Sequence, residues 1–195
     1  MRWYFFVFGC INLLALGIAF ALSLSVVVEY FSYFTVLSNI LITAIFLSIG
    51  FLAPKRAGKE KIIQTLYGPA VLYMGITGIV YWTILHGGKQ LTTDVEWITL
   101  VLHGLMPIMV TIAWLFFKPF FKYSWQHVAY WLLFPLLFVG YTLLRGPSAH
   151  WYPYPFLNPL LVGYTGVMVW TGGILAGGFV LGFLLIQLSA SFHRT

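Results

Sequence analysis

The sequence predicts an all-α integral membrane protein, a bundle of six transmembrane helices. Of its 195 residues, 61% are hydrophobic and only 7% are charged, and the mean hydropathy is +0.94. A soluble domain is about 25% charged and 45–50% apolar, so this composition excludes a soluble globule and a disordered chain. The single cysteine, Cys10, excludes an internal disulfide and a cysteine-built metal site. We expect one transmembrane domain over residues 1–195.

Six stretches are apolar for about 20 residues, the length that a membrane-crossing helix needs. Inside a bilayer each segment must pair its own backbone polar groups, so each stretch is expected to be helical. The first stretch carries no charge after Arg2, and its apolar run exceeds the 7–15 residues of a signal-peptide core. The glycines of the last stretch favour close helix packing. The predicted helices are 3–28, 34–53, 62–85, 97–117, 127–144 and 159–188.

The distribution of lysine and arginine predicts the orientation, because positive loops stay in the cytoplasm. One side of the predicted spans carries eight basic residues: Arg2, Lys55, Arg56, Lys59, Lys61, Lys118, Lys122 and Arg194. The other side carries only Lys89 and Arg145, together with the acids Glu29, Asp94 and Glu96. We therefore expect both termini in the cytoplasm and the chain in the inner (plasma) membrane. The net charge of +6 is then a topological signal, and no nucleic-acid partner is expected.

Polar residues gather near the external end of the predicted bundle. Thr35 and Asn39 lie four residues apart at the start of the second span, so they share a helix face, with Ser38 beside them. His103 lies in the fourth span, roughly 9 Å along its helix from Trp97 at a rise of about 1.5 Å per residue. These side chains share a level if the second and fourth spans touch, which the sequence alone does not show.

Other polar groups mark the external ends of the remaining spans. His86 ends the third span, and Tyr141 and Arg145 end the fifth, so we take all three as supporting residues of a site. The following segment, Trp151–Phe156, contains two prolines and four aromatic residues. Two interpretations of this segment stay open: a lid over the bundle, or an anchor at the membrane surface.

Each candidate also has a structural interpretation. Taken alone, Thr35 is better explained as a helix cap or as a hydroxyl bonded to its own backbone. Asn39 alone is better explained as a hydrogen-bonding contact between helices. His103 differs, because an ionisable residue inside a span is costly and by default indicates a functional site. For that histidine, packing and function stay about equally weighted.

Together these residues contain the parts for acyl transfer or ester hydrolysis. A threonine hydroxyl becomes a nucleophile when a base takes its proton, and histidine is such a base near neutral pH. The Asn39 amide is a candidate to hold an oxyanion or to orient the threonine. No carboxylate lies within the spans to orient the histidine, which leaves three loop acids as candidates: Glu29, Asp94 and Glu96.

Several other chemistries lack their residues. The sequence has no HExxH motif, no aspartate in a span, no GxSxG elbow and no P-loop. A haem needs two axial ligands at a common depth in the membrane, and His86 and His103 are the only candidate pair. We expect no metal and no cofactor.

The chain resembles a bacterial six-transmembrane family related to the eukaryotic androgen-induced and androgen-dependent membrane hydrolases. The resemblance covers the six spans, Phe34-Thr35 with Asn39 at the start of the second span, and His103 in the fourth. The segment Tyr152–Asn158 is similar to a feature of the bacterial branch. The eukaryotic relatives hydrolyse fatty acid esters of hydroxy fatty acids with an intramembrane threonine and histidine. The resemblance implies that Thr35 is the nucleophile and His103 the base.

Three functions remain in competition. The first is an intramembrane hydrolase of lipid esters near the external face, with a lipid or fatty ester as substrate. The second is a small-molecule transporter, which is disfavoured because the charges avoid the spans. The third is a non-enzymatic membrane receptor or assembly protein whose polar residues only hold the bundle together. The distance between the Thr35 hydroxyl and the His103 ring discriminates best between the first and the third.

Overall fold

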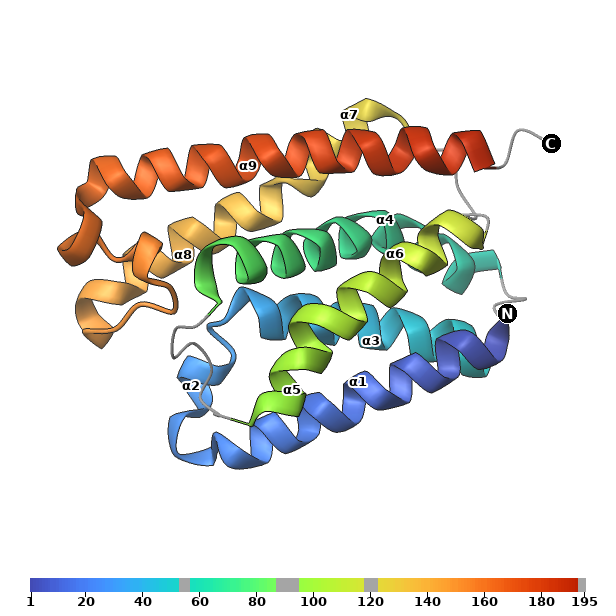
Figure 1. The fold of residues 1–195 in the computed structure, drawn as a ribbon, viewed down its shortest axis with the longest axis horizontal. Helices are drawn as coiled ribbons and strands as arrows, with labels where there is room; N and C mark the ends of the chain where they lie inside the picture. Colours follow the sequence, from blue (N-terminus) through green and yellow to red (C-terminus); the bar gives the residue numbers. More distant parts are fainter. Residues whose placement is uncertain (53–56, 87–94, 118–122, 193–195) are drawn as a thin grey trace.

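A computed structural model describes residues 1–52, 57–86, 95–117 and 123–192, and no residue in these ranges forms a strand. Six helical segments run along the molecule (Figure 1). They are α1 (Arg2–Leu22), α3 (Phe34–Leu52), α4 (Ala57–Val80) with η2 (Tyr81–Leu85), α5 (Glu96–Leu100) with η3 (Val101–Leu105) and α6 (Met106–Phe116), α7 (Trp125–Trp131) with α8 (Leu133–Ala149), and α9 (Pro159–Phe192). Three short elements join them: η1 (Leu24–Val26), α2 (Val27–Tyr30) and η4 (Pro155–Leu157). Both η2 and η3 are π-helical turns, whereas η1 and η4 are 3₁₀ turns.

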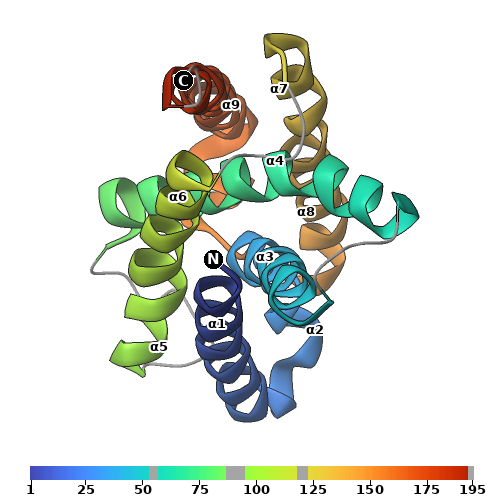
Figure 2. The same cartoon turned by 90° about the vertical axis from the view of Figure 1, so that its right-hand side faces the viewer.

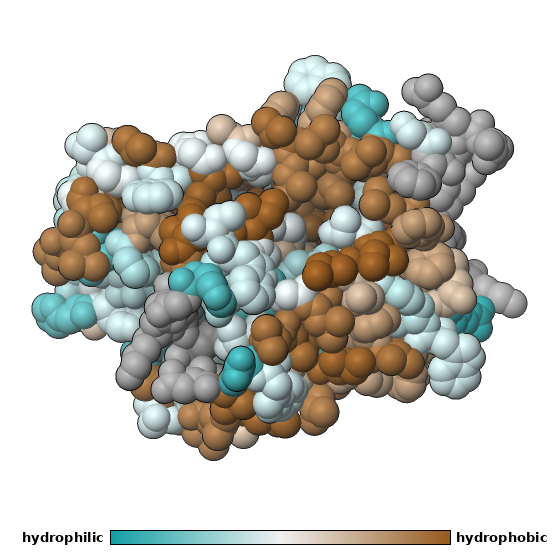
Figure 3. All heavy atoms as spheres, viewed as in Figure 1, coloured by the Kyte–Doolittle hydropathy of each residue, from teal (hydrophilic) through white to brown (hydrophobic). Residues whose placement is uncertain are grey.

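The six segments are long and apolar enough to cross a membrane. Large apolar side chains also cover much of the outer surface (Figure 3). An outer surface of this kind is unfavourable in water. The fold class is therefore the expected one: an all-α bundle with six helices of membrane-spanning length and composition.

Two helices form the interior of the bundle. In the most apolar 18 residues of each span, 67% are buried in Thr65–Leu85 and 56% in Phe34–Phe51, against 17% in Pro159–Leu188. Figure 2 shows α4 crossing between the α1–α3 pair and the α8 and α9 helices. The α1–α3 contact is close at Gly50, where a Cβ atom would lie 2.9 Å from the Phe6 backbone. The side chains that α3 and α4 turn inward are therefore shielded from the surroundings on all sides.

The two ends of the bundle differ. The start of α1, the start of α4, the end of α6 and the end of α9 lie at one end (Figure 1). These are the helix ends next to the segments rich in lysine and arginine. The opposite end holds α2, the start of α5 and the segment between α8 and α9 (Figure 1), and we call it the polar end because Thr35 and Glu29 lie there. The predicted loop residues Lys89 and Asp94 lie outside the described residues.

Several predicted helix ends were wrong. The first helix stops at Leu22 rather than at residue 28. Directly after Leu22, the Ser23 hydroxyl donates to the Ala19 carbonyl (2.7 Å). The chain then turns through η1 and α2, although residues 24–28 are almost as apolar as the helix. The fifth span continues to Ala149 rather than ending at residue 144. Arg145 therefore lies on a helix and not in a loop.

Proline explains the break in the fifth span. Pro135 has no backbone N–H, so the Trp131 carbonyl loses its partner four residues on. The Tyr73 hydroxyl of α4 donates to that carbonyl instead, at 2.7 Å. The span consequently divides into α7 and α8, and α7 begins at Trp125 rather than at His127, which belongs to a capping box with Ser124.

The last helix departs from the prediction in length and packing. It runs to Phe192 rather than to residue 188, and it is kinked at Gly163, whose φ of 67° favours glycine. A Cβ atom would meet nothing within 4 Å at Gly172, Gly173 or Gly177. At these three positions the glycines leave open space. The close contact that we expected is present at Gly178 and Gly182, where a Cβ atom would lie 3.1 Å from Ile76 and 2.7 Å from Val128.

Candidate functional site

Thr35 and His103 meet inside the bundle. Thr35 is the second residue of α3, and its Oγ1 lies 3.2 Å from Nε2 of His103 in η3. The exposed fraction is 5% for Thr35 and 3% for His103. The two residues are 68 positions apart in the sequence, so their contact depends on α3 packing against η3.

The tautomer of His103 is defined by its second ring nitrogen. Nδ1 lies 3.1 Å from the carbonyl oxygen of Thr99. A carbonyl only accepts hydrogen bonds, so Nδ1 carries the proton and donates it. Nε2 then has a free lone pair that faces the Thr35 hydroxyl, which donates to it. This is the arrangement in which histidine acts as a base toward threonine.

A backbone carbonyl thus orients the ring. Of the loop acids that we considered, Asp94 lies outside the described residues. Glu29 is instead the partner of Arg145, at 3.7 Å. Two aromatic residues of η2 fix the histidine further. The Tyr81 ring stacks on the His103 ring with centroids 4.0 Å apart, and Trp82 Nε1 donates to the His103 carbonyl at 3.0 Å.

Both π-helical turns lie at this site. The His103 carbonyl is free to accept from Trp82 because Pro107, four residues later, has no N–H to offer. The turn η3 widens the helix at the histidine, and η2 does the same where Tyr81 contacts it. Such π segments are rare and are often found at functional sites. In the sequence, the proline four residues after His103 signals that the His103 carbonyl lacks its usual helical partner. We predicted the spans from the apolar runs and did not use this signal.

Asn39 and Ser38 hold Thr35 in place. The Asn39 amide donates to the carbonyls of Thr35 (2.8 Å) and Leu102 (3.3 Å), which ties α3 to η3. The Ser38 hydroxyl lies 3.0 Å from the Thr35 carbonyl and 2.9 Å from the Thr77 hydroxyl. Since both amide hydrogens of Asn39 have carbonyl partners, the geometry favours orienting Thr35 over binding an oxyanion.

An apolar cavity of about 60 Å³ opens beside Thr35. Phe34, Tyr81, Phe138 and Tyr154 line it together with aliphatic residues of α4 and α9. A groove of about 260 Å³ between α4 and α9 has three lining residues in common with the cavity: Ile76, Val80 and Ile174. The space beside the threonine therefore adjoins a groove on the outer surface of the bundle.

The segment between α8 and α9 covers this cavity. Tyr154, Phe156 and Leu157 are buried and line it, which fits the lid interpretation better than a surface anchor. The Tyr154 hydroxyl accepts a hydrogen bond from the Thr35 backbone N–H at 3.3 Å. The sequence pattern indicated a lid or an anchor here but did not single out this tyrosine, whose position depends on how the segment folds back.

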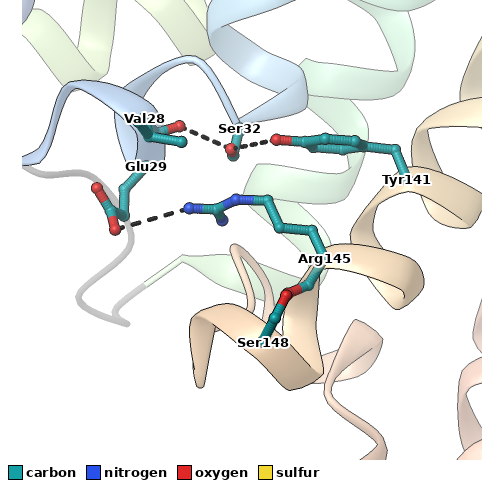
Figure 4. A network of polar contacts seen from close by, with 6 residues as sticks. All are labelled: Val28, Glu29, Ser32, Tyr141, Arg145 and Ser148. Atoms are coloured by element: carbon teal, nitrogen blue, oxygen red, sulfur yellow. Dashed lines mark hydrogen bonds and ion pairs between the residues drawn. The ribbon is translucent and has the colours of Figure 1, made fainter.

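The remaining predicted residues lie at the polar end but do not contact the Thr35–His103 pair. Arg145 pairs with Glu29 and so ties α8 to α2, while the Tyr141 hydroxyl lies 3.0 Å from that of Ser32 in the turn after α2 (Figure 4). His86 packs against the Trp82 ring with centroids 4.6 Å apart. Among the described residues, no group of three or more His, Cys, Asp or Glu side chains is arranged to hold a metal ion.

Comparisons of the chain with protein-family models, with curated proteins and with solved structures find no match. The function is therefore argued from the geometry of the site and from the residue pattern.

Proposed function

We propose that this chain is a multi-pass membrane hydrolase of lipid esters, with Thr35 as its nucleophile and His103 as its base. One observation carries the proposal: the buried Thr35 hydroxyl lies 3.2 Å from the unprotonated ring nitrogen of His103. If His103 only packed the helices together, its unprotonated nitrogen would not need to face a hydroxyl, and that hydroxyl would not need to lie beside a cavity. The resemblance to the threonine-dependent membrane hydrolases supports the same two roles.

The proposed reaction uses this geometry. Thr35 Oγ1 attacks the ester carbonyl carbon while His103 Nε2 takes the hydroxyl proton. The tetrahedral intermediate collapses, the bond to the alcohol breaks, and His103 returns the proton to the departing alcohol oxygen. Water then attacks the acyl-threonine with His103 again as the base. This step releases the fatty acid and restores the Thr35 hydroxyl.

The surroundings of the pair support an apolar substrate. The cavity beside Thr35 and the adjoining groove are lined mainly by aromatic and aliphatic side chains. An acyl chain along these walls places its ester at the threonine. The groove lies between α4 and α9 and so provides a path from the lipid side of the bundle.

Membrane location and orientation form part of the proposal. The six apolar helices are placed across the inner (plasma) membrane, with both termini and the basic segments in the cytoplasm. The polar end, and with it Thr35, then lies near the external face. A reporter enzyme fused after Thr195 tests this: activity on the cytoplasmic side supports the orientation, and activity outside the cell refutes it.

The function is tested with protein purified in detergent and a panel of long-chain fatty esters. We expect Thr35→Ala and His103→Ala to abolish hydrolysis, and Thr35→Ser to keep part of it because the hydroxyl remains. The matched controls are Thr111→Ala, whose hydroxyl bonds only within α6, and His150→Asn at an exposed position. A fluorophosphonate probe should label the wild type and not Thr35→Ala. Unchanged hydrolysis by Thr35→Ala refutes the mechanism, and no hydrolysis by the wild type favours the receptor interpretation.

A further inference from the structure

The nucleophile lies at a helix N-terminus, where backbone N–H groups lack partners inside the helix. α3 begins at Phe34, and its first backbone bonds run from the N–H groups of Val36 and Leu37 to the Tyr33 carbonyl. The Thr35 N–H takes no part in these bonds. Its partner is the Tyr154 hydroxyl, at the long distance of 3.3 Å. A substrate oxygen can replace so weak a bond.

Resting on the proposed function, we propose that the Thr35 N–H and the Tyr154 O–H together form the oxyanion hole, and that Tyr154 is a catalytic residue. During attack by Thr35 Oγ1, the carbonyl oxygen of the ester becomes negatively charged. Two donors aimed at that oxygen stabilise the transition state. The positive end of the α3 dipole, a helix of 19 residues, adds to this effect.

The distances allow this arrangement. The Thr35 nitrogen and the Tyr154 oxygen are 3.3 Å apart, so an oxygen atom can lie about 2.9 Å from both, a normal hydrogen-bond length. The Tyr154 oxygen accepts from the Thr35 N–H, and the phenol also bonds the Thr35 side chain. When an ester binds, rotation about the C–O bond turns the phenolic hydrogen toward the substrate oxygen. Thr35 Oγ1 belongs to the same residue as one donor, and both residues line the cavity. The oxyanion and the acyl chain can therefore be accommodated together.

The tyrosine is held rigidly, as an oxyanion donor has to be. Tyr154 is 6% exposed, and its ring stacks on Phe156 with an angle of 2° between the planes. The Tyr33 ring packs edge-on against it, with centroids 5.9 Å apart. Burial raises the pKa of the Tyr154 phenol, which keeps it protonated at neutral pH. The segment that covers the cavity thus also supplies a donor to the reacting carbonyl.

The balance of protons is unaffected by this role. The Thr35 proton goes to His103 Nε2 and then to the leaving alcohol, while Tyr154 keeps its own proton throughout. When the intermediate collapses, the oxyanion becomes a carbonyl oxygen again, and its hydrogen bonds weaken. Tyr154 therefore acts on the transition state more than on the bound substrate, so its removal should lower kcat and leave KM nearly unchanged.

The test is Tyr154→Phe, which removes one oxygen atom and keeps the ring. We expect kcat to fall about 10²–10³-fold. The matched control is Tyr30→Phe, because that buried hydroxyl bonds the Leu16 carbonyl away from the site. This control should keep the wild-type kcat. Thermal unfolding of both variants shows whether each protein still folds as the wild type does.

A sulfur substitution in the substrate separates a catalytic role from a structural one. Each fatty ester is compared with its thionoester, in which sulfur replaces the carbonyl oxygen and accepts hydrogen bonds poorly. If Tyr154 donates to the oxyanion, Tyr154→Phe slows the oxoester much more than the thionoester. An equal loss for both esters, or an unchanged kcat, overturns the inference. The proposed function fails separately, when Thr35→Ala stays active or the wild type hydrolyses no ester.

Discussion

Filling the groove between α4 and α9 should shorten the acyl chain that the protein accepts. Gly173 lines this groove, and a Cβ atom there meets nothing within 4 Å. A leucine side chain at this position displaces about four methylene groups of a bound chain. At about 0.8 kcal/mol per buried methylene, the loss is about 3 kcal/mol. This corresponds to a decrease of about 100-fold in kcat/KM for long-chain esters.

The assay compares kcat/KM over esters of increasing chain length for the wild type, Gly173→Leu and Gly172→Leu. Gly172 is also open but does not line the groove, so it provides the matched control. Short esters should react equally with all three proteins, because their chains do not reach the groove. Both substitutions raise helix propensity and should not impair folding. Identical chain-length profiles for the three proteins would show that the groove does not hold the acyl chain.

Three further results are expected. The double variant Thr35→Ala/His103→Ala should be little worse than either single variant in a turnover assay, because the two residues act as one unit; an additive loss contradicts that. Asn39→Ala should lower stability by about 1–3 kcal/mol in thermal or denaturant unfolding, because it leaves the Leu102 carbonyl unpaired in the interior, and it should slow hydrolysis less than Tyr154→Phe does. Trp82→Phe should likewise lower stability by about 1–3 kcal/mol, because the His103 carbonyl then loses its donor; an unchanged unfolding midpoint argues against that bond.

The composition was sufficient to predict the all-α class and the six apolar helices, while Thr35 and His103 became the central candidates only together with the family resemblance. Runs of about 20 apolar residues have few stable states other than a membrane-length helix. The four-residue spacing of Thr35 and Asn39 places them on one helix face, since that is a local property of the helix. His103 also became a candidate from local sequence alone, because an ionisable side chain inside an apolar span is energetically costly.

The ends of the helices could not be predicted as well. Apolar runs do not indicate where a helix stops, because residues 24–28 are as suited to a short turn as to another turn of α1. The local sequence does show Pro135, which causes the break before α8, but the carbonyl that this proline leaves free is satisfied by the Tyr73 hydroxyl. That partner comes from another helix, 58 residues away, so local sequence does not reveal it.

By itself, the sequence determined that six apolar helices form and that Thr35 and His103 lie near one end of them. Only the tertiary structure brought the two side chains within 3.2 Å and directed His103 Nδ1 to the Thr99 carbonyl. It also placed Tyr154 against the Thr35 N–H and assigned the Asn39 amide to backbone carbonyls. Hydropathy and helical spacing describe each segment separately. The site, in contrast, depends on how the segments cross and on which carbonyls proline leaves unpaired, and these features arise only when the helices pack together.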